Sequence, residues 1–254
     1  MVTLITCRTC EKAHPKSCEY FEKLKDSDWV CTRDYPENLN GGIMICGLNF
    51  GTDPGDDSNT VKRLCEYLSL KKSLDDPENW RTFYPDVVGM SRFDSRIFKW
   101  FDLWGHPLEG RKGSEGAFEH AFFHRNWSLT QTKTANLSDD MLVREALEPD
   151  GILHVLEKRL PSVIMFFGTR LVGLLNDERI RDRVENILGK RSDKEKIDPV
   201  GKYKMQTQVF GKTHIIGLPH PRAAVAYKDI VALKDNAAFQ SVLAKILEHK
   251  GRSA

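Results

Sequence analysis

Two short loops carry the residue types that could do chemistry in this chain. Residues 47–55 read Gly-Leu-Asn-Phe-Gly-Thr-Asp-Pro-Gly, in which the glycines allow a ligand to approach the backbone and Asn49 offers an amide that can orient a water or a substrate. Residues 217–224 place His220 between two prolines, in a stiff turn that suits a hydrogen-bond donor aimed at developing negative charge. We predict that these two loops build the functional site.

Neither loop is specific by itself. Residues 47–55 lack the Lys-Ser/Thr ending of a P-loop and the spacing of a dinucleotide-binding motif. A plain turn that needs Gly and Asn for positive φ gives the same pattern, and His220 also suits a capping or core histidine. The two loops therefore have to be judged by the elements that position them.

Each loop follows a short apolar strand. We expect strands over residues 43–46, 117–129, 163–168 and 214–218, separated by helical stretches. This alternation predicts an α/β fold, a three-layer α/β/α sandwich with a central, mostly parallel four-stranded sheet. Ligands of such sheets bind beyond the carboxyl ends of the strands, which selects both loops. Helices are expected over residues 57–70, 94–105, 140–160, from 169 onward and over 234–249, and the third of these is expected to divide at Pro149. Residues 176–205 are expected to form a solvated helix and a surface loop.

Composition limits the class of protein. The 254 residues suit one large domain, and we separate a Cys-containing N-terminal extension, residues 1–40, from the main domain, residues 41–254. The apolar runs are far shorter than the ~20 residues of a membrane span, and the N-terminus lacks the pattern of a secretory signal. We therefore expect a cytoplasmic protein that is not secreted and has no membrane partner. A net charge of +2 restricts any nucleic-acid surface to a local patch.

Taken as a pair, the loops resemble the uracil-DNA glycosylase superfamily. The first strand runs into Gly-x-Asn-x-Gly at residues 47–51, and the last strand runs into His220-Pro221. The resemblance is closest to the mismatch-specific and single-strand-selective monofunctional branches, whose first motif is Gly-x-Asn-Pro-Gly. Residues 96–105 are similar to an aromatic helix of the family, and Asn126 stands where the family places a base-reading Asn. The resemblance spans roughly residues 43–248, so we expect a uracil-DNA glycosylase-like domain over residues 41–254.

The resemblance implies an enzyme of base excision repair. It would be a monofunctional DNA glycosylase that hydrolyses the N-glycosidic bond of uracil or a related damaged pyrimidine in DNA and leaves an abasic site. Asn49 would position the attacking water beneath C1′ of a flipped nucleotide, and His220 would hydrogen-bond uracil O2 and stabilise the departing anion. Asn126 would read the Watson–Crick edge of the base through its amide.

The other implied substrate contacts come from the same two loops. Gly51 stands where the most uracil-restricted members carry a Tyr that excludes the thymine methyl, so we expect room for C5 substituents. Arg222 is expected to contact phosphate or the opposite strand. Both loops depart from the family pattern: Phe50 replaces a Pro in the first, and residues 222–224 replace the Ser-Pro that follows His-Pro in the second. The implied substrate-binding set is Gly47, Leu48, Phe50, Gly51, Asn126 and Arg222.

The N-terminal cysteines are a separate question. Four of the six cysteines, Cys7, Cys10, Cys18 and Cys31, precede the first strand, a number sufficient for zinc or an iron–sulfur cluster. Some branches of the family hold such a cluster beginning with an N-terminal Cys-x-x-Cys, but their second pair follows the first motif, where this chain has only Cys65. Reduced thiols are the alternative, and the expected reaction itself requires no cofactor.

Two other classes of function stay open. The fold could serve as a non-catalytic nucleic-acid-binding or interaction module, or the loops could bind a small nucleotide in an unrelated α/β enzyme. For the leading hypothesis we expect a monomer whose partner is DNA containing uracil or another deaminated or damaged base. If the protein acts on DNA, the alternative to a cytoplasmic location is the nucleoid or the nucleus.

Overall fold

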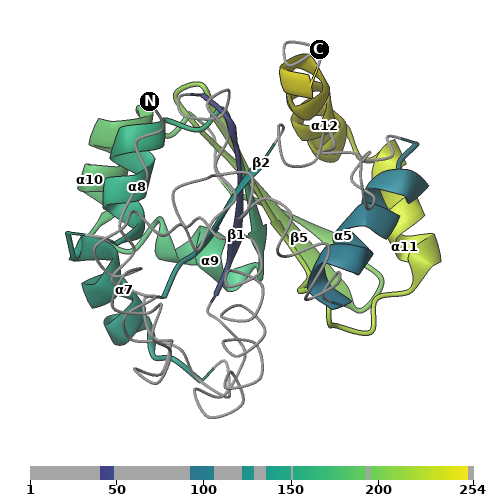
Figure 1. The fold of residues 1–254 in the computed structure, drawn as a ribbon, viewed down its shortest axis with the longest axis horizontal. Coiled ribbons are helices and arrows are strands. Elements are labelled where there is room, and N and C mark those ends of the chain that lie inside the picture. Colours follow the sequence, from purple (N-terminus) through teal and green to yellow (C-terminus); the bar gives the residue numbers. More distant parts are fainter. Residues whose placement is uncertain are drawn as a thin grey trace, which may run out of the picture.

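A computed structural model describes residues 41–48, 92–105, 122–128, 136–149, 151–192 and 195–250. Within these ranges the chain forms one six-stranded sheet in the order β2-β1-β3-β6-β5-β4 (Figure 1). The strands are β1 Ile43–Gly47, β2 Phe122–Asn126, β3 Val163–Phe167, β4 Lys196–Val200, β5 Tyr203–Phe210 and β6 Thr213–Leu218.

The four strands expected from the sequence all form. β2, β1, β3 and β6 pair in parallel, so their carboxyl ends lie at one edge of the sheet. The prediction of a four-stranded sheet is wrong, however, because β5 and β4 add to β6 in antiparallel orientation and make the sheet mixed. The prediction of a helix and surface loop over residues 176–205 is also wrong in its second half, where β4 and the start of β5 lie. The α/β class is confirmed.

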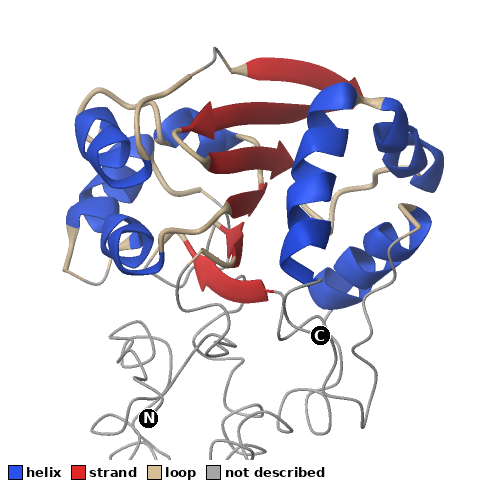
Figure 2. Cartoon of the chain, turned by 90° about the horizontal axis from the view of Figure 1, so that it is seen from above, coloured by secondary structure: helices blue, strands red, loops and turns tan. Residues whose placement is uncertain are grey.

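Helices cover both faces of the sheet (Figures 1 and 2). One face packs against α5 Arg92–Leu103, α11 Tyr227–Ala232, the short 3-10 helix Leu233–Asp235 and α12 Ala237–Lys250. The other face packs against α7 Asp139–Leu147, α8 Ile152–Arg159, α9 Arg170–Leu174 and α10 Arg181–Leu188. Two apolar cores result, one on each side of the sheet.

The strands are apolar throughout because both of their faces are covered. In β1, Ile43 and Ile45 enter the core beneath α5, whereas Met44 and Cys46 enter the core beneath α7 and α8, and all four side chains are buried. A strand buried on two faces shows a continuous apolar run in place of alternation. This is the pattern by which β1 and β3 can be predicted from the sequence.

The aromatic helix α5 belongs to the core. The Trp100 ring lies 6.0 Å from that of Phe167 on β3, and the Trp104 ring lies 4.7 Å from that of Phe239 on α12. The Trp104 Nε1–H donates to the Ile230 carbonyl at 2.9 Å, so its polar atom is satisfied inside the core. Gly105, with φ of 82°, follows the helix in the left-handed conformation typical of a helix end.

The expected division of the long helix near Pro149 is confirmed. α7 begins behind Ser138, whose hydroxyl accepts from the Met141 N–H, and ends at Leu147, and α8 begins after Gly151. The expected helix over residues 57–70 and the extension over residues 1–40 lie outside the described residues. No helix in the described ranges is long and apolar enough to cross a membrane.

Candidate functional site

The carboxyl ends of β1 and β2 place Gly47 and Asn126 side by side. The two residues are partners in the parallel register. A Cβ at Gly47 would lie 2.7 Å from Oδ1 of Asn126, so the Asn126 side chain occupies the space that the missing side chain leaves. Glycine is required at position 47 for this close approach, and the Asn126 amide is held at the strand end.

Hydrogen bonds extend this pairing beyond the strands. The Trp127 N–H donates to the Gly47 carbonyl, and the Ser128 N–H donates to the Leu48 carbonyl, both at 2.8 Å. The partly buried Leu48 side chain packs against the core on the α7 side. The predicted site residues Asn49, Phe50 and Gly51 follow directly in the chain and lie outside the described residues.

His220 begins a tight turn two residues after β6. Its carbonyl accepts from the Ala223 N–H at 2.7 Å, and Pro221 fills the second turn position, where its fixed φ fits. The His220 ring closes the turn a second time, because Nδ1 accepts from the backbone N–H of Arg222 at 3.1 Å. Arg222 is exposed, His220 is exposed over part of its surface, and Pro221 is buried.

The bond to Nδ1 decides which ring nitrogen carries the proton. A nitrogen that accepts a hydrogen bond is unprotonated, so neutral His220 carries its proton on Nε2. Partial burial of the ring, and secondly the charge of Arg222, lower the pKa of His220 below its ordinary value. Near neutral pH, His220 is therefore a neutral ring whose Nε2–H is the donor.

A residue of α5 holds the turn from the other side. NH1 of Arg96 donates to the carbonyl oxygens of Pro221 and Ala223, at 2.6 Å each. α5 is fixed in turn by its buried tryptophans, so the turn that carries His220 is anchored to the core through one guanidinium. The sequence placed Arg96 in a helix of the expected family pattern, but no motif predicts that its side chain reaches across to residues 221–223.

The ends of β1 and β3 lie between Asn126 and His220. Three inter-strand steps separate β2 from β6, roughly 14 Å at the usual strand spacing. Directly after β3, Gly168 has a φ of 138° and a Cβ there would meet no atom within 4 Å. The described site is thus a row of strand ends with polar groups at its two sides and glycines at Gly47 and Gly168 between them.

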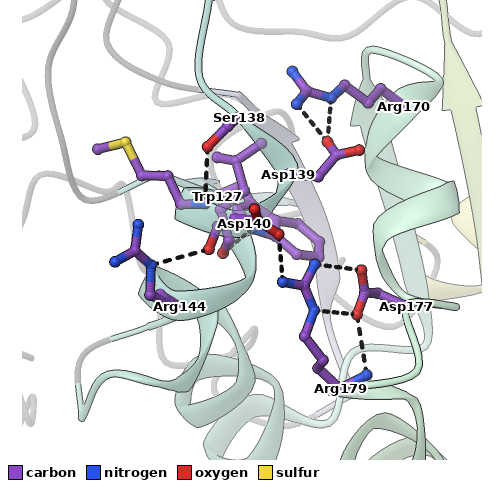
Figure 3. Close-up of polar contacts among 10 residues, drawn as sticks. Trp127, Ser138, Asp139, Asp140, Arg144, Arg170, Asp177 and Arg179 are labelled. Carbon is purple, nitrogen blue, oxygen red and sulfur yellow. Dashed lines mark hydrogen bonds and ion pairs between the residues drawn. The ribbon is translucent and has the colours of Figure 1, made fainter.

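The segments that follow β2 and β3 are tied together (Figure 3). Arg170, at the start of α9, donates through Nε to Asp139 at 2.7 Å and through NH2 to the Leu137 carbonyl at 2.6 Å. Arg179 forms a two-pronged pair with Asp177, with both distances 2.8 Å, and reaches Asp140 at 2.5 Å. These contacts fix the beginning of α7 against the loops after β3.

A second tie joins β2 to α7 itself. The Trp127 Nε1–H donates to the Leu142 carbonyl at 3.0 Å, and the Ser128 hydroxyl donates to Oε2 of Glu145 at 2.6 Å. Both residues follow Asn126 directly. The side chains of Trp127 and Ser128 are therefore used by the fold, whereas the Asn126 side chain lies over Gly47.

The described part of the chain contains no cluster of three or more His, Cys, Asp or Glu residues that could hold a metal ion. The candidate ligands Cys7, Cys10, Cys18 and Cys31 lie outside the described residues, so a metal at these positions stays a prediction. No protein-family model matches the chain, and no curated protein matches it.

Proposed function

We propose that this chain is a monofunctional DNA glycosylase that hydrolyses the N-glycosidic bond of uracil or a related damaged pyrimidine and leaves an abasic site. The observation that carries the proposal is the placement of Asn126 over Gly47 at the same sheet edge as the His220 turn. These are the positions at which the motif resemblance expects a base-reading amide and a leaving-group donor.

The chemistry of His220 supports its proposed role. When the glycosidic bond breaks, the base departs with the bonding electron pair, and negative charge develops on uracil O2. A neutral Nε2–H donor stabilises this charge without having to give up a proton. Arg222, two residues after His220 in the same turn, is proposed to add positive charge near the departing anion and to contact DNA phosphate.

Asn126 supplies the proposed recognition. An amide carries both an acceptor and two donors, so it can accept from N3–H and donate to O4 of uracil. Cytosine presents the reverse pattern at these two positions and would be disfavoured. The proposed water-positioning residue is Asn49, and an amide cannot take a proton from water, so bond cleavage would depend chiefly on stabilising the departing base. Leu48, Phe50 and Gly51 are proposed to complete the substrate loop.

The direct experiment is an excision assay over single- and double-stranded oligonucleotides that contain uracil, hypoxanthine, xanthine or 5-substituted uracils. We expect release of uracil by the wild-type chain and its loss in His220→Ala and Asn49→Ala. Wild-type rates in both variants would refute the proposed catalytic roles. Binding of DNA without any excision would favour a nucleic-acid-binding module, and a thermal shift by free nucleotides but not by DNA would favour a small-nucleotide enzyme.

Gly47→Ala tests the recognition part of the proposal. The new Cβ would lie 2.7 Å from Oδ1 of Asn126 and must displace the amide. Because a misplacement of about 1 Å can cost roughly 100-fold in rate, we expect kcat/KM for uracil to fall by at least tenfold. Gly173→Ala is the matched control, since a Cβ there meets no atom within 4 Å. Equal activity of the two variants would argue against a role of Asn126 in base reading.

A further inference from the structure

Arg96 lies outside the two predicted loops and contacts the turn that carries His220. Its NH1 lies between the carbonyl oxygens of Pro221 and Ala223, 2.6 Å from each. Bonds from a guanidinium to carbonyl oxygens are charge-assisted and stronger than those between neutral groups. They join positions far apart in the chain, and together with the buried Pro219 and Pro221 they fix the turn on the rest of the molecule.

The helix that carries Arg96 cannot easily follow a moving turn. Ile97, Trp100, Phe101 and Trp104 of α5 are all buried in the core beneath it. Trp104 also donates to the Ile230 carbonyl, within α11, at 2.9 Å. α5 therefore acts as a fixed support, and the contacts of Arg96 transmit its position to residues 221–223.

The two carbonyls that Arg96 binds flank the backbone group that sets the His220 tautomer. The Arg222 N–H, which donates to Nδ1 of His220 at 3.1 Å, belongs to the peptide unit whose carbonyl is that of Pro221. A peptide unit is planar, so holding its oxygen also fixes the direction of its N–H. Arg96 thus orients the Arg222 N–H, from which Nδ1 of His220 accepts a hydrogen bond.

We propose that Arg96 is a positioning residue that, through the Pro221 peptide, keeps the His220 ring in one orientation with its proton on Nε2. It does not touch the substrate in this role. The inference about the ring stands on geometry alone, and only its consequence for rate rests on the proposed glycosylase function. Without Arg96 the peptide unit can rotate, Nδ1 loses its donor and the ring exchanges between tautomers.

The test is nitrogen-15 NMR of the His220 ring in the full chain, compared between wild type, Arg96→Met and Arg96→Lys. We expect the wild-type shifts of a single Nε2–H tautomer, averaged shifts in Arg96→Met, and recovery toward wild type in Arg96→Lys, because lysine retains a charged donor. Arg144→Met is the control, since Arg144 also donates to a backbone carbonyl, that of Asp140 at 3.3 Å, but on the opposite face of the sheet.

The kinetic consequence separates this inference from the proposed function. In uracil excision we expect Arg96→Met to lower kcat by roughly tenfold or more with little change in KM. Unchanged ring shifts in Arg96→Met would overturn the positioning role, whatever the activity. Altered ring shifts in a chain that releases no base would uphold it and refute the glycosylase proposal. If Arg96→Met fails to fold, Arg96→Leu serves instead, since leucine also has no donor: wild-type-like ring shifts in Arg96→Leu would overturn the role and averaged shifts would uphold it.

Discussion

Arg125 precedes Asn126 in β2 and is buried. The residue is 8% exposed, and its NH2 has no hydrogen-bond partner within the described part of the chain. Its register partner on β1 is Cys46, and burial raises the pKa of that thiol, so Cys46 stays neutral and does not compensate the charge. An incompletely paired buried charge opposes folding. The presence of Arg125 is therefore not explained by a contribution to the stability of the sheet.

Replacement of Arg125 by methionine should therefore stabilise the chain. Methionine fills a similar volume without a charge, and we expect the free energy of unfolding to rise by about 1–3 kcal/mol. Urea denaturation measures the change. Arg170→Met should act in the opposite direction, because Arg170 is paired with Asp139 and with the Leu137 carbonyl. A loss of stability in Arg125→Met would mean that the guanidinium contributes a favourable interaction.

At the scale of residues, the sequence predicted positions better than contacts. Apolar runs that stop at Gly or Pro predict the ends of β1 and β6, and Gly47 lies at the end of β1 and His220 two residues after β6. The strand predicted over residues 117–129 ends at Asn126, a position that the family resemblance indicated and the apolar pattern did not. The hydrogen bonds from Arg96 to the His220 turn were not predicted, because Pro221 and Ala223 lie 125 and 127 positions after Arg96 in the chain. Contacts of this kind depend on how α5 packs, which local patterns do not encode.

At the scale of elements, ion pairs join the start of α7 to the start of α9 and to the segment between α9 and α10. Arg179 holds Asp177 and Asp140, and its side-chain hydrogen bond is the main cause that lowers the pKa of Asp177 to about 2. A carboxyl with a lowered pKa stabilises the fold above its unfolded pKa of 3.8, and this contribution is lost as the pH falls through about 2.

We predict that Arg179→Ala raises the pKa of Asp177 toward 3.8. Stability near neutral pH should fall, and its dependence on pH between about 4 and 2 should flatten, because the variant has no bond left to lose on protonation. Carboxyl NMR shifts of Asp177 and urea denaturation across this range measure both effects. Lys99→Ala is the control, since Lys99 pairs with Asp102 on the exposed side of α5, away from these ion pairs. Acid profiles that coincide for wild type and Arg179→Ala would contradict this contribution of Arg179.

The strands missed by sequence interpretation were hidden for identifiable reasons. β4 contains Pro199, which lacks an N–H and is tolerated because β4 is an edge strand. β5 buries polar side chains, among them Gln208, whose amide exchanges hydrogen bonds with that of Asn176 at 2.8 and 3.1 Å. Such a paired amide removes the apolar signal of the strand, although the Gly211-Lys212 turn that follows is a hairpin signal.

At the scale of the whole molecule, the two edges of the sheet have different tasks. The carboxyl edge of the parallel strands carries Gly47, Asn126 and the His220 turn, whereas the opposite edge carries the residues that precede β1 and β6. Gly41 and Gly211 lie at this opposite edge, with φ of 76° and 53°. Both positions favour glycine because of their positive φ, and neither contacts the proposed site. Substitutions there are therefore expected to change stability without changing activity.

Gly211→Ala should lower stability more than Gly41→Ala and leave excision by the folded chain unchanged. Each alanine must adopt a left-handed conformation, at a cost of about 1–2 kcal/mol. At Gly211 the new Cβ would also lie 2.4 Å from the Leu188 carbonyl oxygen, whereas at Gly41 it would meet no atom within 4 Å. Urea denaturation of both variants isolates the steric part as the difference between them, and excision rates corrected for the folded fraction report on the site. Equal losses would show that the hairpin relaxes away from α10, and a reduced corrected rate in either variant would show that the two edges of the sheet are mechanically coupled.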